Sequence, residues 1–276
     1  MHLGNARTAL LAWLDARSRG GRILLRIEDL DRDRCRPQYA DLARRDLAWL
    51  GLDWDAETAL QSTRERGYAA AVARLAGAGV AYPCSCSRRE LAVASAPHGE
   101  DGERRYPGTC RDPARRPAGR PAAVRVMMPD HELTIDDRLH GPVVQNPARQ
   151  VGDVVVRRSD GLHAYQLAVV VDDAADGVTD VVRGDDLLAS AGRQRALQQL
   201  LGLPAIGYAH VPLMRGVDGA RLAKRHGAIT IAEQRAAGRS PAVVVGELAA
   251  GLGLVAPGQP ATPLELVAGF RLASAA

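Results

Sequence analysis

Two short segments of this sequence hold residue types that are suited to nucleotide chemistry. The segment His2-Leu3-Gly4-Asn5 opens a helical pattern, and a glycine without a Cβ lets a nucleotide approach the free N–H groups of a helix N-terminus. The segment Arg221-Leu222-Ala223-Lys224-Arg225 follows an apolar run, where a basic loop can bring Lys224 to phosphates whose charge grows in a transition state. Each segment alone is also compatible with a plain helix start or a solvated basic loop.

Three of the four cysteines lie in one loop-rich stretch. Cys84 and Cys86 form a tight pair, Cys110 follows downstream, and Cys35 stands apart as an expected free thiol. Without an export signal, this spacing favours metal binding over a disulfide. A tetrahedral Zn²⁺ site needs a fourth ligand, for which His98 is the candidate of an ordinary type. Three reduced, unbound cysteines are the alternative.

Composition places the chain among globular proteins. It has 276 residues, of which 46% are hydrophobic, and no apolar run approaches the roughly 20 residues that span a bilayer. A net charge of +4 is compatible with a polyanionic partner such as nucleic acid, although a mild excess of arginine is also typical of a solvated surface. We expect a cytoplasmic monomer that does not contact membranes.

Helical and strand patterns alternate along the chain, which predicts an α/β fold. We expect helices over residues 5–18, 64–78 and 189–201, another from Pro37, and strands over 22–31, 122–128, 180–184 and 208–214. Asp160-Gly161 lies between two apolar runs and predicts a hairpin within 153–173.

A change of composition marks an insertion. Residues 83–121 are rich in proline and arginine and interrupt the regular patterns. We therefore expect two halves of one catalytic core at 1–82 and 122–214, a zinc-binding insertion at 83–121, and a basic loop with a short helical subdomain at 215–276.

The motifs resemble those of class I aminoacyl-tRNA synthetases. "HLGN" stands where that class has a His-Ile-Gly-His signature, and "RLAKR" where it has Lys-Met-Ser-Lys-Ser. The longer blocks 2–31, 164–188 and 210–228 resemble the glutamyl-type catalytic core, and the resemblance covers about residues 2–235. It implies a Rossmann-like parallel sheet with ATP at the carboxyl ends of the strands.

The length of the chain and the spacing of its cysteines indicate which of the glutamyl-type synthetases it resembles. The chain leaves no room for the large helical anticodon-binding region of ordinary glutamyl-tRNA synthetases, and its Cys84, Cys86, Tyr106 and Cys110 are arranged as in glutamyl-Q tRNA(Asp) synthetases. That family implies one structural Zn²⁺ with Tyr106, rather than His98, as the fourth ligand.

The family also implies an activity. ATP activates L-glutamate without tRNA, and the glutamate is then transferred to the queuosine base in the anticodon of tRNA(Asp). A truncated ordinary glutamyl-tRNA synthetase and a non-catalytic tRNA-binding paralogue are the alternatives.

The resemblance assigns roles to the nucleotide residues. His2 and Gly4 would lie beside ATP, Asn5 replaces the last signature histidine, and Lys224 would meet the phosphates. Mg²⁺ is implied with the ATP, without an assigned ligand in the chain.

The resemblance also assigns residues to a glutamate pocket. Glu28 would hold the α-amino group, and Tyr165 and Arg183 would complete the pocket, the planar guanidinium being suited to a carboxylate. The plain alternatives are a carboxylate that caps a strand end for Glu28 and a surface ion pair for Arg183.

Related chains carry a strand and a Pro-Ser-Pro-Thr-Gly segment before the signature. This sequence lacks them, so we expect Met1 to be a wrongly chosen start rather than the start of a damaged, possibly inactive chain.

Overall fold

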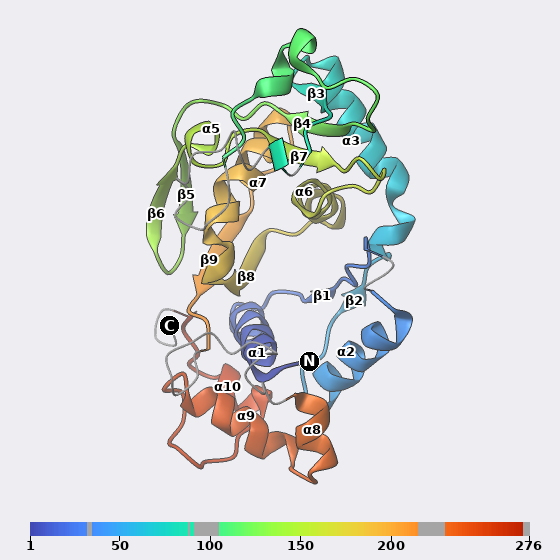
Figure 1. The fold of residues 1–276 in the computed structure, drawn as a ribbon. Helices are drawn as coiled ribbons and strands as arrows, with labels where there is room; N and C mark the ends of the chain where they lie inside the picture. The colour runs from blue at the N-terminus through green and yellow to red at the C-terminus, as the bar shows by residue number, and fades with distance from the viewer. Residues whose placement is uncertain (32–34, 88, 91–104, 215–229, 273–276) are drawn as a thin grey trace.

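The computed structural model describes residues 1–31, 35–87, 89–90, 105–214 and 230–272 (Figure 1). Its longer helices are α1 (Leu3–Ser18), α2 (Pro37–Trp49), α3 (Glu65–Gly77), α6 (Tyr165–Asp176), α7 (Leu188–Leu200) and α9 (Pro241–Ala250). Shorter ones are α5 (Pro147–Gln150), α8 (Ile231–Ala236) and α10 (Pro263–Val267). Within these described ranges, no helix combines the length and apolar character that crossing a bilayer requires.

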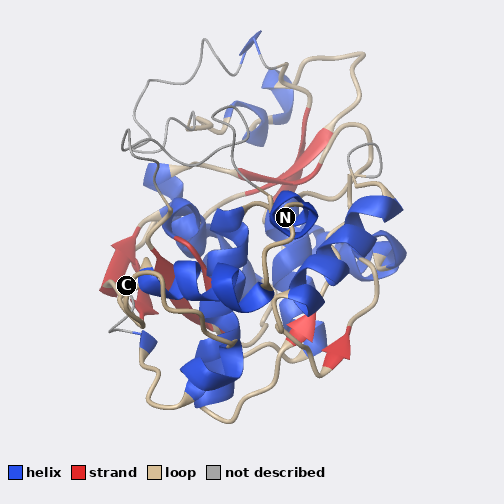
Figure 2. Ribbon diagram, turned by 90° about the horizontal axis from the view of Figure 1, so that it is seen from below, coloured by secondary structure: helices blue, strands red, loops and turns tan. Residues whose placement is uncertain are grey.

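The strands form three sheets, which Figure 2 shows as separate groups with helices between them. The strands are β1 (Leu24–Leu25), β2 (Ala56–Glu57), β3 (Ala81–Cys84), β4 (Ala123–Val126), β5 (Leu133–Asp137), β6 (Gly141–Gln145), β7 (Val154–Arg157), β8 (Asp180–Gly184) and β9 (Gly207–Val211). The largest sheet has the order β6-β5-β9-β8, and the second has the order β3-β4-β7.

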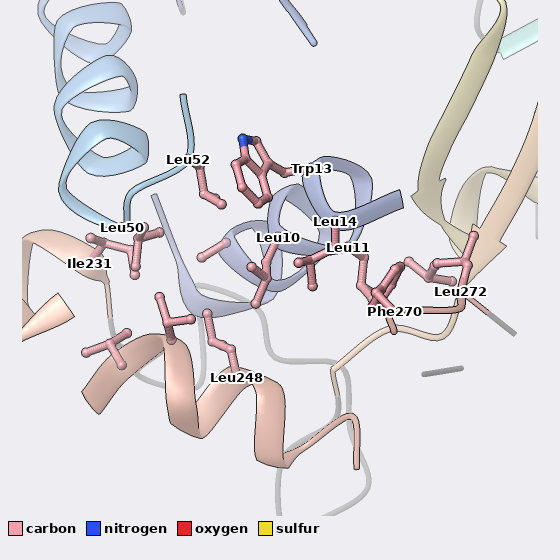
Figure 3. Packing of buried hydrophobic residues seen from close by; sticks show 14 of the residues in the cluster. Leu10, Leu11, Trp13, Leu14, Leu50, Leu52, Ile231, Leu248, Phe270 and Leu272 are labelled. Carbon is pink, nitrogen blue, oxygen red and sulfur yellow. The ribbon is translucent and has the colours of Figure 1, made fainter. Parts of the chain in front are cut away.

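Helix α1 lies at the centre of one hydrophobic core. Its sequence places Leu10, Leu11, Trp13 and Leu14 on the buried side, where they pack with residues of α9 and of the segment around Phe270 (Figure 3). Each fully buried side chain of this size contributes about 1.5–3 kcal/mol of burial free energy. The apolar face of α1 therefore fixes the position of its N-terminus, which carries the first signature.

The parallel strands β5, β9 and β8 form the Rossmann-like part of the main sheet, and β6 is added antiparallel at the edge. The register of β8 and β9 pairs Arg183 with His210 near the carboxyl ends of both strands. Ligands of open α/β sheets bind at this end. The predicted α/β fold with a parallel core is confirmed, and the core places two polar residues side by side there.

The predicted strand over residues 22–31 is mostly wrong. Only Leu24–Leu25 forms β1, which pairs in parallel with β2 instead of entering the main sheet. Beyond Leu25 the chain is held by side chains, since Asp29 accepts hydrogen bonds from the backbone N–H and the hydroxyl of Ser62 at 2.8 and 2.6 Å. This irregular course brings Glu28 out of the sheet.

The predicted hairpin within 153–173 is half correct. Strand β7 is followed by a turn at Gly161 and a single bridge between Arg157 and His163, and then helix α6 begins at Tyr165. The continuous apolar run of α6 lies in the second hydrophobic core, and such a run fits a buried helix as well as a buried strand. The antiparallel pair of β5 and β6 escaped the sequence prediction.

Candidate active site

The N-terminus of α1 places the first signature. The Nδ1 atom of His2 accepts a hydrogen bond from the backbone N–H of Asn5 at 3.2 Å, so His2 caps the helix. Gly4 makes room for this ring, because a Cβ there would lie 3.2 Å from it. His2 also forms a β-bridge with Thr230, and Met214 lies 3.9 Å from the same Cβ position. The described residues on both sides of 215–229 thus meet at this helix end, while Lys224 lies outside the described residues.

Glu28 lies in the irregular segment after β1 beside a second carboxylate. The guanidinium of Arg26 is 3.3 Å from the Glu28 carboxylate and 2.7 Å from that of Asp173 on α6. Loss of hydration raises the pKa of Glu28, and Arg26 offsets only part of this effect. A carboxylate in such surroundings gains from a further positive group. The geometry thus suits an ammonium ligand at Glu28.

Tyr165 is the first residue of α6, and the charges of Glu28 and Arg183 both act on its hydroxyl. Burial raises the pKa of its hydroxyl, the charge of Glu28 raises it further, and the charge of Arg183 lowers it. The three residues predicted for the glutamate pocket, Glu28, Tyr165 and Arg183, are therefore electrostatic neighbours, although Glu28 comes from a loop, Tyr165 from a helix and Arg183 from a strand.

Arg183 is held inside the protein from several sides. Its side chain is 8% exposed, its Nε donates to His210 Nε2 at 2.9 Å, and its Nη1 donates to Gln194 at 2.7 Å. The guanidinium also lies over the ring of Tyr208, 4.7 Å from the centroid. Arg183 is thus buried and oriented, which contradicts the alternative of a surface ion pair.

His210 is paired in turn with Asp137. Their Nδ1 and Oδ2 atoms are 2.6 Å apart, and both side chains are fully buried. Burial lowers the pKa of His210, although its contact with Asp137 opposes this shift. For Asp137, hydrogen bonds outweigh the effect of burial, and its pKa is lowered.

The lowered pKa of His210 predicts a pH dependence of stability. Below pH 6.5, the ordinary value for histidine, the unfolded chain binds a proton that the folded chain binds less readily. The free energy of unfolding should therefore fall as the pH decreases, by up to about 1.4 kcal/mol per pH unit. His210→Gln should lack this part of the slope in urea unfolding from about pH 5 to 8. Equal slopes in both proteins would contradict the assignment.

The four residues predicted as zinc ligands come together. The Tyr106 hydroxyl lies 3.4 Å from Cys84 Sγ and 3.8 Å from Cys86 Sγ, and the sulfurs of Cys86 and Cys110 are 3.3 Å apart. All three sulfurs lie within 4.8 Å of one another. Tetrahedral zinc with bonds of 2.0–2.3 Å places neighbouring ligand atoms about 3.5–3.8 Å apart. This set therefore fits zinc, while His98 lies outside the described residues.

A buried arginine lies beside these candidate ligands. Arg125 donates to Cys84 Sγ at 3.4 Å, and its guanidinium lies 3.9 Å from the centroid of the Tyr106 ring. Zinc with three thiolates and a phenolate would carry a net charge of −2, which Arg125 reduces. Gly152 lets the backbone of Tyr106 approach closely, because a Cβ there would lie 2.2 Å from the Tyr106 carbonyl oxygen.

Several residues of the candidate pocket escaped the sequence prediction. Arg26 and Asp173 balance the charge around Glu28, and Gln194 and the Asp137–His210 pair hold Arg183. The double aspartate inside the apolar run of α6 was a visible signal, since a carboxylate is rarely buried without a partner. No comparable signal marked Asp137.

Comparison with known proteins defines the class. The sequence profile "tRNA synthetases class I (E and Q), catalytic domain" matches residues 1–253. The fold is similar to the crystal structure of a glutamate tRNA ligase from Elizabethkingia meningosepticum in complex with its amino acid, with a TM-score of 0.83 and 25% identity. That match covers all of this chain and 63% of the other. Fold and profile define the catalytic domain of a class I tRNA synthetase.

More similar relatives define the family. A glutamyl-Q tRNA(Asp) synthetase of Symbiobacterium thermophilum is 53% identical over 99% of this chain and 89% of its own length. One of Nocardia farcinica is 54% identical over 98% of this chain and 85% of its own length. The chain belongs to the glutamyl-Q tRNA(Asp) synthetase family.

Proposed function

We propose that this protein activates L-glutamate with ATP, without tRNA, and transfers the glutamate to the queuosine base in the anticodon of tRNA(Asp). The observation that carries this proposal is the similarity to relatives of that name, at 53–54% identity over nearly the whole chain. The sequence identity with the glutamate tRNA ligase is only 25%, which makes an ordinary glutamyl-tRNA synthetase the weaker candidate.

The pocket chemistry supports glutamate as the substrate. An amino acid with an acidic side chain carries one ammonium and two carboxylates, and the pocket offers the Glu28 carboxylate and the Arg183 guanidinium. Opposite charges within a shielded site form strong hydrogen bonds. We assign Glu28 to the α-amino group, and Tyr165 and Arg183 to the rest of the amino acid.

The helix end of α1 supports the nucleotide assignment. His2, Gly4 and Asn5 would line the ATP site, with Lys224 at the phosphates and Mg²⁺ bound with the nucleotide. The support is the meeting of Met214 and Thr230 with His2 and Gly4, since these residues flank the basic segment in the sequence. Free N–H groups at a helix N-terminus favour phosphate.

A structural zinc ion completes the proposal. Cys84, Cys86, Tyr106 and Cys110 would hold it as a closed site, in which zinc stabilises the fold of the insertion and takes no part in the reaction. We further propose a monomer in the cytoplasm, where ATP and tRNA occur; light scattering tests the oligomeric state.

The decisive experiment uses two substrates in sequence. The protein should catalyse glutamate-dependent ATP–pyrophosphate exchange without tRNA. It should then attach radiolabelled glutamate to an anticodon stem-loop of tRNA(Asp) that contains queuosine, although this fragment has no 3′ acceptor end. Glutamylation of intact tRNA(Glu) instead would indicate an ordinary synthetase. No exchange by folded, zinc-loaded protein would indicate a non-catalytic paralogue.

Glu28→Gln tests the amino-acid site. The change removes a charged acceptor and should weaken glutamate binding by about 2 kcal/mol, which is roughly 30-fold in KM. The KM for ATP should stay within twofold, because no nucleotide contact is assigned to Glu28. Glu132→Gln, at an exposed position before β5, is the control. Unchanged glutamate kinetics in Glu28→Gln would remove this residue from the site.

A further inference from the structure

Arg183 is a buried cation without a buried counter-charge in contact. No carboxylate of the described residues lies within 4.0 Å of its guanidinium nitrogens, although the side chain is almost completely buried. A buried charge without a partner is costly, so such a group in a pocket suits an anionic ligand. Its orientation must then come from neutral groups.

Three neutral acceptors use three of the five N–H groups of Arg183. They are His210 Nε2, Gln194 Oε1 and, at 3.3 Å, the carbonyl oxygen of Leu187. Two N–H groups remain without a contact to the described residues, and a carboxylate needs two for a paired contact. The contacts thus hold the guanidinium while they leave it able to bind an anion.

The contact with His210 determines where the histidine proton lies. An arginine N–H can only donate, so His210 Nε2 must accept, and the ring proton must be on Nδ1. From there it is donated to Asp137 Oδ2. Asp137 Oδ1 accepts the backbone N–H groups of Leu139 and His140 at 2.9 and 3.0 Å, which fixes the carboxylate in place.

We propose that Asp137 and His210 are positioning residues for the amino-acid substrate: Asp137 holds the imidazole in the neutral Nδ1–H form, and His210 Nε2 orients the Arg183 guanidinium toward a substrate carboxylate. Neither residue touches the substrate. This inference rests on the proposed function, because it assumes that Arg183 binds glutamate.

Asp137→Asn tests the inference with little change of shape. Its amide oxygen should stay at the Oδ1 position, where it accepts the backbone N–H groups of Leu139 and His140. The amide nitrogen then replaces Oδ2, so the hydrogen bond from the backbone N–H of His210 to Oδ2 at 3.1 Å is lost as well. The amide N–H₂ then faces His210 Nδ1 and donates to it, so the ring proton moves to Nε2 and points at the Nε–H of Arg183. The KM for glutamate should rise on the order of tenfold to hundredfold, while the KM for ATP should stay within about twofold.

Two controls separate positioning from general damage. Asp136→Asn removes the same charge from the neighbouring, exposed position of β5 and should leave both KM values unchanged. Nitrogen-15 NMR of the histidine rings should show the proton of His210 on Nδ1 in the wild type and on Nε2 in Asp137→Asn. This measurement needs no substrate.

A second pair of variants covers the case that Asp137→Asn fails to fold. His210→Gln places an amide oxygen where it can accept from Arg183 Nε, whereas His210→Leu cannot. Glutamate KM should therefore be closer to the wild type in the Gln variant.

Different outcomes would overturn different claims. A wild-type glutamate KM in folded His210→Leu, or an Nε2 proton in the wild type, would overturn the inference and leave the proposed function intact. Absence of glutamate-dependent exchange in the wild type would overturn the proposed function, and the inference with it.

Discussion

Cys110→Ser should abolish stoichiometric zinc binding and unfold the insertion, whereas Cys35→Ser should change neither. Cys110 is completely buried among the other candidate ligands, while Cys35 lies far along the sequence and outside that cluster. Structural zinc contributes roughly 10 kcal/mol to the folding of a small unit. Because the three cysteine sulfurs and the Tyr106 hydroxyl meet at the centre of residues 83–121, loss of the metal should have a large local effect.

Three measurements check the zinc prediction. Metal analysis should find one zinc per chain in the wild type and in Cys35→Ser. Limited trypsin digestion should cleave the arginine-rich insertion of Cys110→Ser much faster, with the remaining core protected. Tyr106→Phe should release zinc to a chelator faster, and His98→Ala should not. Normal zinc content in Tyr106→Phe, together with loss of zinc in His98→Ala, would identify His98 instead of Tyr106 as the fourth ligand.

Asp172→Ala should reduce the free energy of unfolding by about 3–5 kcal/mol. The Asp172 side chain is 1% exposed, and it accepts hydrogen bonds from Tyr68 at 2.8 Å, Gln61 at 2.8 Å and Arg64 at 3.2 Å. Removal of the carboxylate leaves three donors, two of them fully buried, without their partner. A buried polar group without a partner costs more free energy than its hydrogen bond contributed to stability.

Asp130→Ala is the matched control for this measurement. Asp130 pairs with Arg149 at 2.7 Å, but both side chains are well exposed, and such pairs contribute about 0–1 kcal/mol. Asp172→Asn should lie between the two, because an amide oxygen can still accept from Tyr68. Urea unfolding at neutral pH compares all three variants. A loss of less than 1 kcal/mol in Asp172→Ala would show that the network relaxes around the missing group.

Helix positions could be predicted from the sequence more reliably than strand positions. The apolar spacing of Leu10, Leu11 and Leu14 and the glycines after Ser18 predict α1 almost to its observed ends. The strand over 22–31 could not be predicted correctly, because side-chain contacts of Asp29 hold that segment, and such contacts leave no periodic pattern. The helical state of α6 depends on its packing in the core, which overrides local preference.

The site, like the fold, contains residues that the sequence predicts and residues that it does not. The motifs that resemble known ones predict Glu28, Tyr165 and Arg183 as site residues, and in the structure the charges of Glu28 and Arg183 both act on Tyr165. Asp137 and His210 could not be predicted, since their relation depends on the register of β5, β9 and β8, which no local sequence feature specifies. For Asp172 the sequence signals a buried carboxylate, but its partners Gln61, Arg64 and Tyr68 lie more than 100 residues away and no local pattern identifies them.

The packing of α1 against the last part of the chain has a consequence during synthesis. Leu14 leaves the ribosome long before Phe270 and Leu272, which cover the same core. At about 5–20 residues per second, the interval is on the order of 10 to 50 s. During that time the apolar face of α1 lacks its final partners, and this core can close only after residues 241–272 have been translated.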